Sequence, residues 1–152
     1  MVFFLTALLV VVADQLSKMW IRSNLVVGQS LLEVGFFRIS RIHNTGAAFG
    51  LFRDQSFTLT IVALVGIVVL LLYALLIYRR FPILDNRLGK SVLGLVLGGT
   101  VGNLIDRLRF GYVTDFIDVG IWPAFNIADS AIVVGVIILA YSLLPLARAE
   151  KR

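Results

Sequence analysis

Residues 98–130 read GGTVGNLIDRLRFGYVTDFIDVGIWPAFNIADS and hold four of the nine acidic residues of a very apolar chain. The four are Asp106, Asp115, Asp118 and Asp129. They lie where one hydrophobic segment ends and another begins, which is where a membrane protein can bring carboxylates together beside both lipid and water. We therefore expect two of them to form a hydrolytic pair.

The composition indicates a membrane protein. Of the 152 residues, 59% are hydrophobic and the mean hydropathy is +0.96, whereas soluble domains are roughly 45–50% apolar. We expect a single integral membrane domain over residues 1–152.

The net charge of +5 does not indicate a nucleic-acid partner. Nucleic-acid binding needs Lys and Arg clustered on a polar surface, but here the basic residues gather at the ends of apolar runs, a pattern typical of membrane topology. The chain has no cysteine and one histidine, which excludes disulfides, a cysteine nucleophile and thiolate or multi-histidine metal sites. We expect no metal, no cofactor and no nucleic acid.

Four apolar segments predict four transmembrane helices. The segment 57–78 has no charged residue, and a rise of about 1.5 Å per residue lets it cross the roughly 30 Å hydrocarbon core. The run 2–13 is too short alone, so its helix has to continue past Lys18 to about Trp20. No basic region precedes this run, so we read it as a mature helix rather than a cleaved signal peptide. The predicted spans are about 2–20, 57–78, 91–107 and 126–146.

The segments between the spans indicate the topology. The loop after the second span carries four basic residues and one acidic residue, which favours the cytoplasmic side. With four spans, both termini are then cytoplasmic, and residues 23–56 and 108–125 lie outside. Glycines and short apolar bursts in 23–56 predict short strands and turns rather than a helix.

Two local patterns concern helix packing. Gly94, Gly98 and Gly102 recur every four residues in the third span, so they share one helix face, which we interpret as a site of close helix packing. Asp14 and Lys18 in the first span stand at i and i+4 with the acid first, the favourable order for a helical ion pair.

The aspartates of the opening stretch differ in their neighbours. Asp106 adjoins Arg107, and an arginine favours the ionised carboxylate, which suits a structural ion pair better than a group that must hold a proton. Asp115 has no adjacent base, and Asp129 lies one turn into the fourth span on the same helix face as Asn126. For these two aspartates, catalysis and pairing with a distant arginine remain equally open.

Two carboxyls within hydrogen-bonding distance hold one proton between them near neutral pH, because repulsion and desolvation raise one pKa. The ionised member can take a proton from water while the protonated member polarises a peptide carbonyl. A serine hydrolase is disfavoured, because Ser130 has no neighbouring histidine and His43 stands alone in the first outer segment.

Five short motifs resemble, in order and over nearly the whole chain, those of the lipoprotein signal peptidases, also called signal peptidase II. Each motif alone is weak, but five in order on a four-span chain of this length identify the chain as a member of that family. The motifs are Asp14-Gln15-x-Ser17-Lys18, Asn44-Thr45-Gly46-Ala47-Ala48-Phe49, Gly98-Gly99-x-x-Gly102-Asn103-x-x-Asp106-Arg107, Val113-x-Asp115-Phe116 and Phe125-Asn126-x-Ala128-Asp129.

The resemblance implies an aspartyl endopeptidase that removes the signal peptide of a bacterial prolipoprotein immediately before a cysteine that carries diacylglycerol. It implies that Asp115 and Asp129 are the catalytic pair. The residues implied to bind the substrate are Asn44, Gly46, Asn103, Arg107 and Asn126, and those implied to support the site are Asp14, Lys18, Asp106 and Ala128.

The resemblance also implies an all-α membrane protein of four transmembrane helices with two outer features. These are a small extracytoplasmic β-cradle in residues 23–56 and a short extracytoplasmic helical loop in residues 108–125. The enzyme would lie in the bacterial cytoplasmic (inner) membrane with its active site toward the outer face. Membrane lipid and globomycin-type peptide inhibitors are further implied partners.

The alternative is a small four-helix proton-coupled transporter, since intramembrane aspartates also relay protons. A transporter predicts aspartates near mid-membrane and a duplicated half. The acidic residues of this chain collect at one end of the spans, and the sequence shows no repeat.

Overall fold

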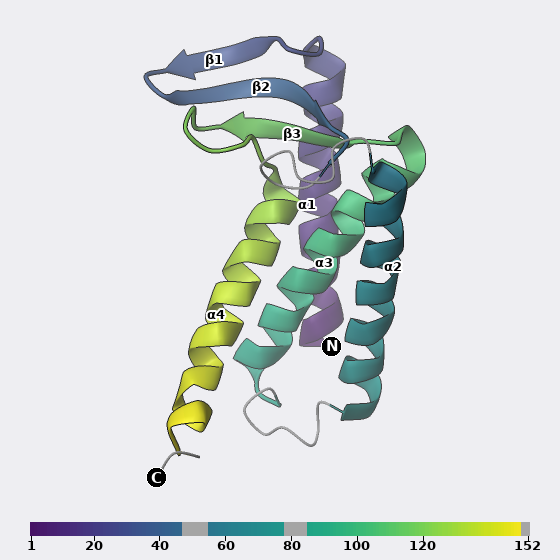
Figure 1. Ribbon diagram of the computed structural model, residues 1–152, viewed down its shortest axis with the longest axis vertical. Helices are drawn as coiled ribbons and strands as arrows, with labels where there is room; N and C mark the ends of the chain where they lie inside the picture. The colour runs from purple at the N-terminus through teal and green to yellow at the C-terminus, as the bar shows by residue number, and fades with distance from the viewer. Residues whose placement is uncertain (47–54, 78–84, 150–152) are drawn as a thin grey trace.

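The computed structural model describes residues 1–46, 55–77 and 85–149. Its helices lie side by side, and a small sheet crosses one end of them (Figure 1). The start of the first helix and the end of the last lie toward the opposite end (Figure 1). In chain order the elements are α1 (Val2–Asn24), β1 (Ser30–Val34), β2 (Phe37–Asn44), α2 (Ser56–Leu72), the π-helical turn η2 (Tyr73–Ile77), α3 (Arg87–Phe110), β3 (Val113–Asp118) and α4 (Ile127–Ala149).

Within the described residues, three helices are long and apolar enough to cross a membrane, and each overlaps a predicted span. The apolar part of α4 found there, Ile127–Ser142, is shorter, so the fourth span stays a prediction. The mostly helical membrane fold with a small sheet is confirmed. The three helices are Val2–Asn24, Ser56–Leu75 and Arg87–Phe110.

The helix α3 lies between α1 and α4, because its glycines let both neighbours approach closely. A Cβ atom at Gly94 or at Gly98 would lie only 2.6 Å from a backbone carbonyl oxygen of α1. On the adjacent side of α3, Gly99 is packed against the backbone of Ala128 in α4. The predicted packing face is therefore confirmed, and it joins α3 to α1.

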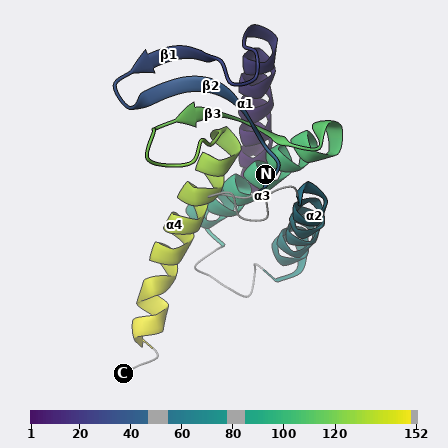
Figure 2. The same cartoon turned by 45° about the horizontal axis from the view of Figure 1, so that its top comes forward.

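The sheet is antiparallel with the strand order β1-β2-β3, and Figure 2 shows it lying across the ends of α1 and α4. The strands predicted in residues 23–56 are thus present as β1 and β2. Asp115 of β3 is paired with Ile42 of β2, and Val113 with Asn44. This register brings Asn44 to the same end of the sheet as Asp115.

The sheet is attached to α1 by apolar and polar contacts. Ile21 of α1 and Leu25, which directly follows the helix, form a buried cluster with Phe116 of β3. Arg41 of β2 donates from Nη1 to the carbonyl oxygens of Arg22 (3.1 Å) and Leu25 (2.9 Å) at the end of α1. A cation at the C-terminal end of a helix is stabilised by the unpaired carbonyl groups there.

The prediction of a short helical loop in residues 108–125 is wrong, because that segment contains the strand β3 (Val113–Asp118). The helix α3 ends at Phe110, and Gly111 follows it in the left-handed conformation with φ of 77°. The β-branched and aromatic residues after Gly111 favour an extended backbone. Pairing with β2 on one side and with Phe125 on the other supplies hydrogen bonds to that backbone.

Candidate active site

The carboxylate of Asp115 lies where the sheet meets α3 and α4. Only 1% of the residue is exposed, and both of its carboxylate oxygens accept hydrogen bonds from amides. Asn44 of β2 donates from Nδ2 to Oδ2 at 2.9 Å, and Asn126 donates from Nδ2 to Oδ1 at 2.7 Å. The two asparagines hold the carboxyl group between β2 and the start of α4.

The pKa of Asp115 is raised to about 7, first by burial and second by the negative charge of Asp129. The hydrogen bonds from Asn44 and Asn126 and the charge of Lys18 act in the opposite direction without cancelling this effect. Asp115 can therefore hold a proton near neutral pH and still release it, which is the property that a general acid needs.

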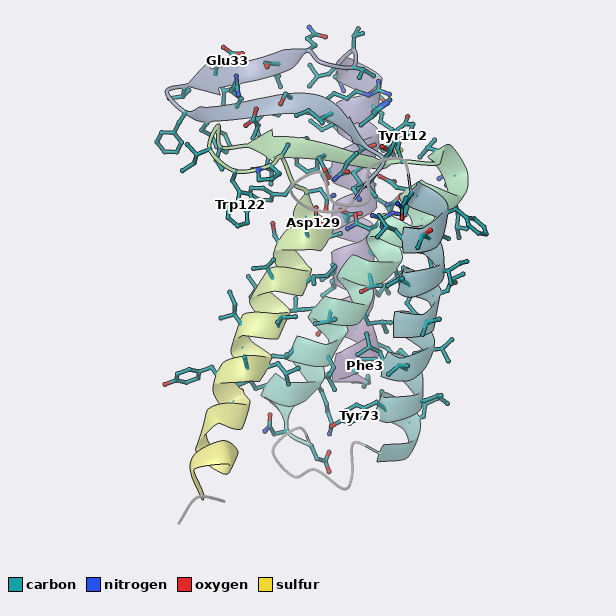
Figure 3. All side chains as sticks on the ribbon, viewed as in Figure 1. Phe3, Glu33, Tyr73, Tyr112, Trp122 and Asp129 are labelled. Atoms are coloured by element: carbon teal, nitrogen blue, oxygen red, sulfur yellow. The ribbon has the colours of Figure 1, made fainter. Side chains whose placement is uncertain are left out.

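The second carboxylate, Asp129, lies in the first turn of α4, at the sheet end of the helices in Figure 3. Its Oδ1 accepts a hydrogen bond from Asn103 Nδ2 at 2.7 Å, and its Oδ2 accepts one from the backbone N–H of Asn126 at 3.3 Å. In return, the Asp129 N–H donates to Asn126 Oδ1 at 2.9 Å. This reciprocal pair resembles a capping box and begins the helix, so the motif that places Asp129 is local.

Asn126 joins the two aspartates. Its Oδ1 accepts from the Asp129 backbone, and its Nδ2 donates both to Asp115 and, at 3.2 Å, to Asn103 Oδ1. The residue is completely buried. Asp115 and Asp129, which lie 14 positions apart in the sequence, are therefore held around one amide group.

A buried ion cluster lies beside this pair. Lys18 is fully buried, and its Nζ lies 2.8 Å from Asp14 Oδ2 and 3.5 Å from Asp106 Oδ2. The predicted Asp14–Lys18 ion pair is thus present. Asp106 does not pair with the adjacent Arg107 but with Lys18 and, at 3.2 Å, with Arg22. Buried charges need such partners, because an unpaired charge in this environment is strongly destabilising.

Carboxylate oxygens of the cluster also accept hydrogen bonds from the backbone of the site. Asp14 Oδ1 accepts from the backbone N–H of Ala128 at 3.0 Å, and Asp106 Oδ2 accepts from that of Thr114 at 2.9 Å. These bonds attach the start of α4 and the strand β3 to α1 and α3. The expected supporting residues thus contact the segments that carry Asp115 and Asp129.

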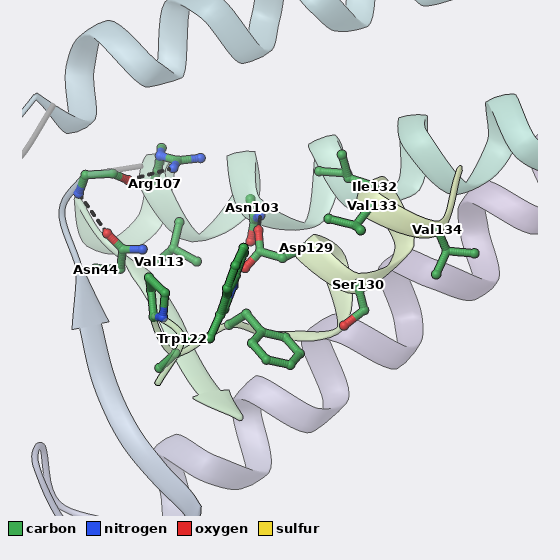
Figure 4. A pocket seen from close by; sticks show the side chains of 14 residues that line it. Asn44, Asn103, Arg107, Val113, Trp122, Asp129, Ser130, Ile132, Val133 and Val134 are labelled. Carbon is green, nitrogen blue, oxygen red and sulfur yellow. Dashed lines mark hydrogen bonds between the residues drawn. The ribbon is translucent and has the colours of Figure 1, made fainter. Parts of the chain in front are cut away.

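A cavity of ≈ 470 Å³ opens next to Asp129 (Figure 4). Its polar lining includes Asn44, Asn103 and Arg107. Arg107 donates from Nη2 to the carbonyl oxygen of Gly46 at 3.3 Å, and its buried Nε has no hydrogen-bond partner among the described residues. The rest of the lining is mainly apolar and comes from Trp122, Pro123, Phe125, Ile132, Val133 and Val134.

Asp118 and His43 have partners other than the carboxylate pair. Asp118 forms an ion pair with Arg38 at 2.9 Å on the sheet. His43 stacks on Tyr112 at a centroid distance of 3.6 Å, and burial and the nearby Arg41 lower its pKa. Ser130 lines the same cavity as Asp129, but its hydroxyl donates to the backbone carbonyl of Asn126. Residues 47–49 of the second motif lie outside the described residues.

The sequence interpretation missed two polar residues at the site, Arg22 and Thr114. Arg22 Nη1 donates to Thr114 Oγ1 at 3.1 Å as well as to Asp106. Arg22 follows Lys18 by four residues and therefore lies on the same face of α1, a spacing that was available in the sequence. Thr114 carries no comparable signal, because its role depends on the backbone position of β3.

No group of three or more histidine, cysteine, aspartate or glutamate residues with metal-binding geometry occurs in the part of the chain that the structure describes. The arrangement instead provides two buried acidic groups held around one amide: Asp129 lines the cavity, and Asp115 has a raised pKa. Such groups can move protons to and from a substrate that enters the cavity.

Comparisons with known proteins agree on one family. The family described as "Signal peptidase (SPase) II" matches residues 6–145. A lipoprotein signal peptidase of Dehalococcoides mccartyi (strain CBDB1) is 53% identical over 90% of this chain and 85% of its own length. One of Moorella thermoacetica is 50% identical over 95% and 93%.

Two solved structures are similar to this one. One is a bacterial membrane enzyme determined by the in meso method at 2.3 Å resolution, with a TM-score of 0.83 and 30% identity over 94% of this chain and 87% of that one. The other, determined by the same method at 1.9 Å, has a TM-score of 0.79 and 31% identity over 93% and 92%.

Proposed function

The chain belongs to the signal peptidase II family, a family of membrane-embedded peptidases that process lipoproteins, and we propose that Asp115 and Asp129 are its catalytic pair. The reaction proposed is cleavage of a bacterial prolipoprotein immediately before the cysteine that carries diacylglycerol. The enzyme is then an aspartic endopeptidase that needs neither a metal nor a covalent intermediate.

The observation that carries this proposal is the placement of the two carboxyls around Asn126, with Asp129 lining the cavity. The raised pKa of Asp115 supports the proposal, because an acid that holds its proton near pH 7 can protonate the carbonyl of the scissile peptide bond. One carboxyl activates water while the other polarises the peptide carbonyl.

The remaining lining suits a peptide with a lipid attached. Asn44, Asn103 and Arg107 offer polar groups to the peptide backbone, and Arg107 retains a buried N–H without a partner among the described residues. Val133 and Val134 belong to the exposed apolar surface of α4, which faces lipid if α4 is the fourth span. The acyl chains of the substrate then lie in the bilayer while its peptide crosses the two aspartates.

Anchoring in the bilayer helps catalysis by restricting the depth and orientation of the scissile bond, an effect that can supply several kcal/mol. In this proposal, α4 spans the bacterial inner membrane, both termini are cytoplasmic and the site opens toward the outer face. Globomycin-type peptides are then expected to compete for the same cavity.

The proposal is tested by incubating the purified protein, in detergent or lipid, with one prolipoprotein in its diacylglyceryl-modified and unmodified forms. We expect cleavage of the modified form only, at the bond before the modified cysteine, as read by mass spectrometry. Equal cleavage of both forms would contradict the proposed substrate, and cleavage elsewhere would contradict the proposed site of cutting.

A further inference from the structure

The side-chain amide of Asn103 has a defined orientation because of Lys18. Lys18 Nζ donates to Asn103 Oδ1 at 2.8 Å, and both groups are buried. An ammonium group has three donors and no acceptor, so only the oxygen of the amide can face it. The NH₂ group is thereby directed to the other side, where Nδ2 lies 2.7 Å from Asp129 Oδ1.

The hydrogen bond that Asp129 receives differs from those that Asp115 receives. The oxygen of the Asn103 amide accepts from the Lys18 ammonium group. This positive charge polarises the amide and makes its N–H groups stronger donors. The amides bound to Asp115 are those of Asn126 and Asn44, whose oxygens accept from the neutral backbone N–H groups of Asp129 and Gly46. Of the two carboxyls, Asp129 therefore has the donor that better stabilises a negative charge.

We propose that Lys18 is a positioning residue that acts through Asn103 to keep Asp129 ionised, so that Asp129 is the general base and Asp115 holds the proton. This inference rests on the proposed function and assigns a separate role to each carboxyl. The raised pKa of Asp115 agrees with it.

The assignment gives a balanced reaction. Asp129 takes a proton from water, the water oxygen bonds to the carbonyl carbon, and Asp115 gives its proton to the carbonyl oxygen. As the C–N bond breaks, Asp129 returns its proton to the leaving nitrogen. One hydroxyl of the tetrahedral intermediate gives its proton to Asp115 to form the new carboxyl group, and both aspartates regain their starting states.

Other charges near the pair limit how the test can be built. The groups on neighbouring elements are Asp14, Lys18 and Arg22 on α1, Asp106 and Arg107 on α3, and Asp115 on β3. Replacing Lys18 alone changes the charge of the cluster as well as the orientation of the amide. The double variant Lys18→Met/Asp14→Asn removes one charge of each sign, so the directed donor is lost without a change in net charge. The amide oxygen of an asparagine at residue 14 can still accept from the backbone N–H of Ala128.

The experiment measures kcat and KM for cleavage of the modified prolipoprotein from pH 4.5 to 9, together with the melting temperature. For the double variant we expect the acidic limb of the plot of kcat against pH to shift to higher pH by about one unit. This is the shift expected from the loss of one strong hydrogen bond. KM is expected to change less than about twofold. A wild-type profile in a folded double variant would overturn the proposal.

Gln15→Met is the matched control. Gln15 Nε2 donates to the carbonyl oxygen of Gly102 (3.0 Å), to Asp14 (3.1 Å) and to Asp106 (3.4 Å), but it does not contact the side-chain amide of Asn103. This variant is expected to lower the melting temperature and leave the pH profile unchanged. If Gln15→Met moves the acidic limb equally, the effect belongs to the whole cluster and the specific role of Lys18 is refuted.

Asn103→Asp decides the question if the double variant does not fold. An aspartate there can still accept from Lys18 and Asn126, but it presents an acceptor to Asp129 in place of the donor. We expect the acidic limb to move up again, and an unchanged profile would contradict the proposal. If the wild-type protein does not cleave the modified substrate, the proposed function itself fails, which is a separate result.

Discussion

Asn126 Nδ2 donates to Asp115 Oδ1 at 2.7 Å, a bond that connects the residue preceding α4 to the strand β3. The same asparagine begins α4 by its reciprocal bonds with Asp129. Any displacement of the start of α4 therefore moves both carboxyls. This dependence makes the site sensitive to helix packing some distance away.

Replacing either carboxyl of the pair removes a proton-transfer group. Asp115→Asn and Asp129→Asn are each expected to lower kcat by about 10²–10⁴-fold, measured by cleavage of the modified prolipoprotein. Asp106→Asn should retain part of the activity, because Asp106 contacts Lys18, Arg22 and Thr114 but neither Asp115 nor Asp129.

Asp118→Asn is the matched control for Asp115→Asn. Asp118 lies on the same strand but forms its ion pair with Arg38, away from the cavity. It should keep nearly full activity. If Asp115→Asn cleaves normally while Asp118→Asn does not, the assignment of the pair is wrong.

Stability should depend on pH through Asp115. Because its pKa in the folded protein is about 7 against about 3.9 unfolded, the folded state binds the proton more tightly. The free energy of unfolding therefore falls as pH rises from about 4 to 7. The decrease is about 1.4 kcal/mol for each pH unit between the unfolded and the folded pKa of Asp115. Asp115→Asn, which stays neutral, should melt higher than the wild type at pH 7.5.

The same comparison at pH 5 provides the control. There the wild-type carboxyl is already protonated in the folded state, so the difference in melting temperature between Asp115→Asn and the wild type should shrink. A difference that stays constant with pH would show that Asp115 does not titrate in this range.

Close packing of α1 on α3 should not tolerate a methyl group. Gly98→Ala places a Cβ 2.6 Å from the carbonyl oxygen of Ala7, and overpacking of this kind typically costs about 1–3 kcal/mol. We expect a lower melting temperature and reduced cleavage, since α1 carries Asp14 and Lys18. Gly66→Ala in α2, where nothing lies within 4 Å, should leave both measurements unchanged.

Trp122 lines the cavity and is expected to contact the substrate. Trp122→Ala should raise KM about tenfold, equivalent to losing about 1.4 kcal/mol of apolar contact, with little change in kcat. The adjacent Ile121 is 97% exposed, so Ile121→Ala is the control in the same assay. Equal effects of both variants would indicate a general disturbance of the loop.

A metal chelator should not change the rate of cleavage. The expected mechanism uses two carboxyls and water, and both aspartates accept hydrogen bonds from amides. Dialysis against EDTA followed by the cleavage assay checks this expectation. Loss of activity that returns when a divalent cation is added would contradict the metal-free mechanism.

The sequence by itself determined the features that depend on local spacing and composition. Uninterrupted apolar runs predicted the helices, because length and hydropathy are properties of a segment alone. The glycine face of α3 and the Asp14–Lys18 pair followed from the helical repeat, which brings residues three and four apart together. The family motifs added the choice of Asp115 as the partner of Asp129, which remains a prediction about role.

Only the tertiary structure decided how distant segments meet. The pairing of Asp106 with Lys18 and Arg22 joins residues more than 80 positions apart, and no local repeat encodes such a contact. The segment before α4 became a strand rather than a helical loop because β2 was available to pair with it. Asp115 and Asp118 lie three residues apart on that strand, so they point to opposite faces. Packing against α1 and α3 buries the first four residues of the strand on both faces, so Asp115 is buried and Asp118, at the strand's end, is less so.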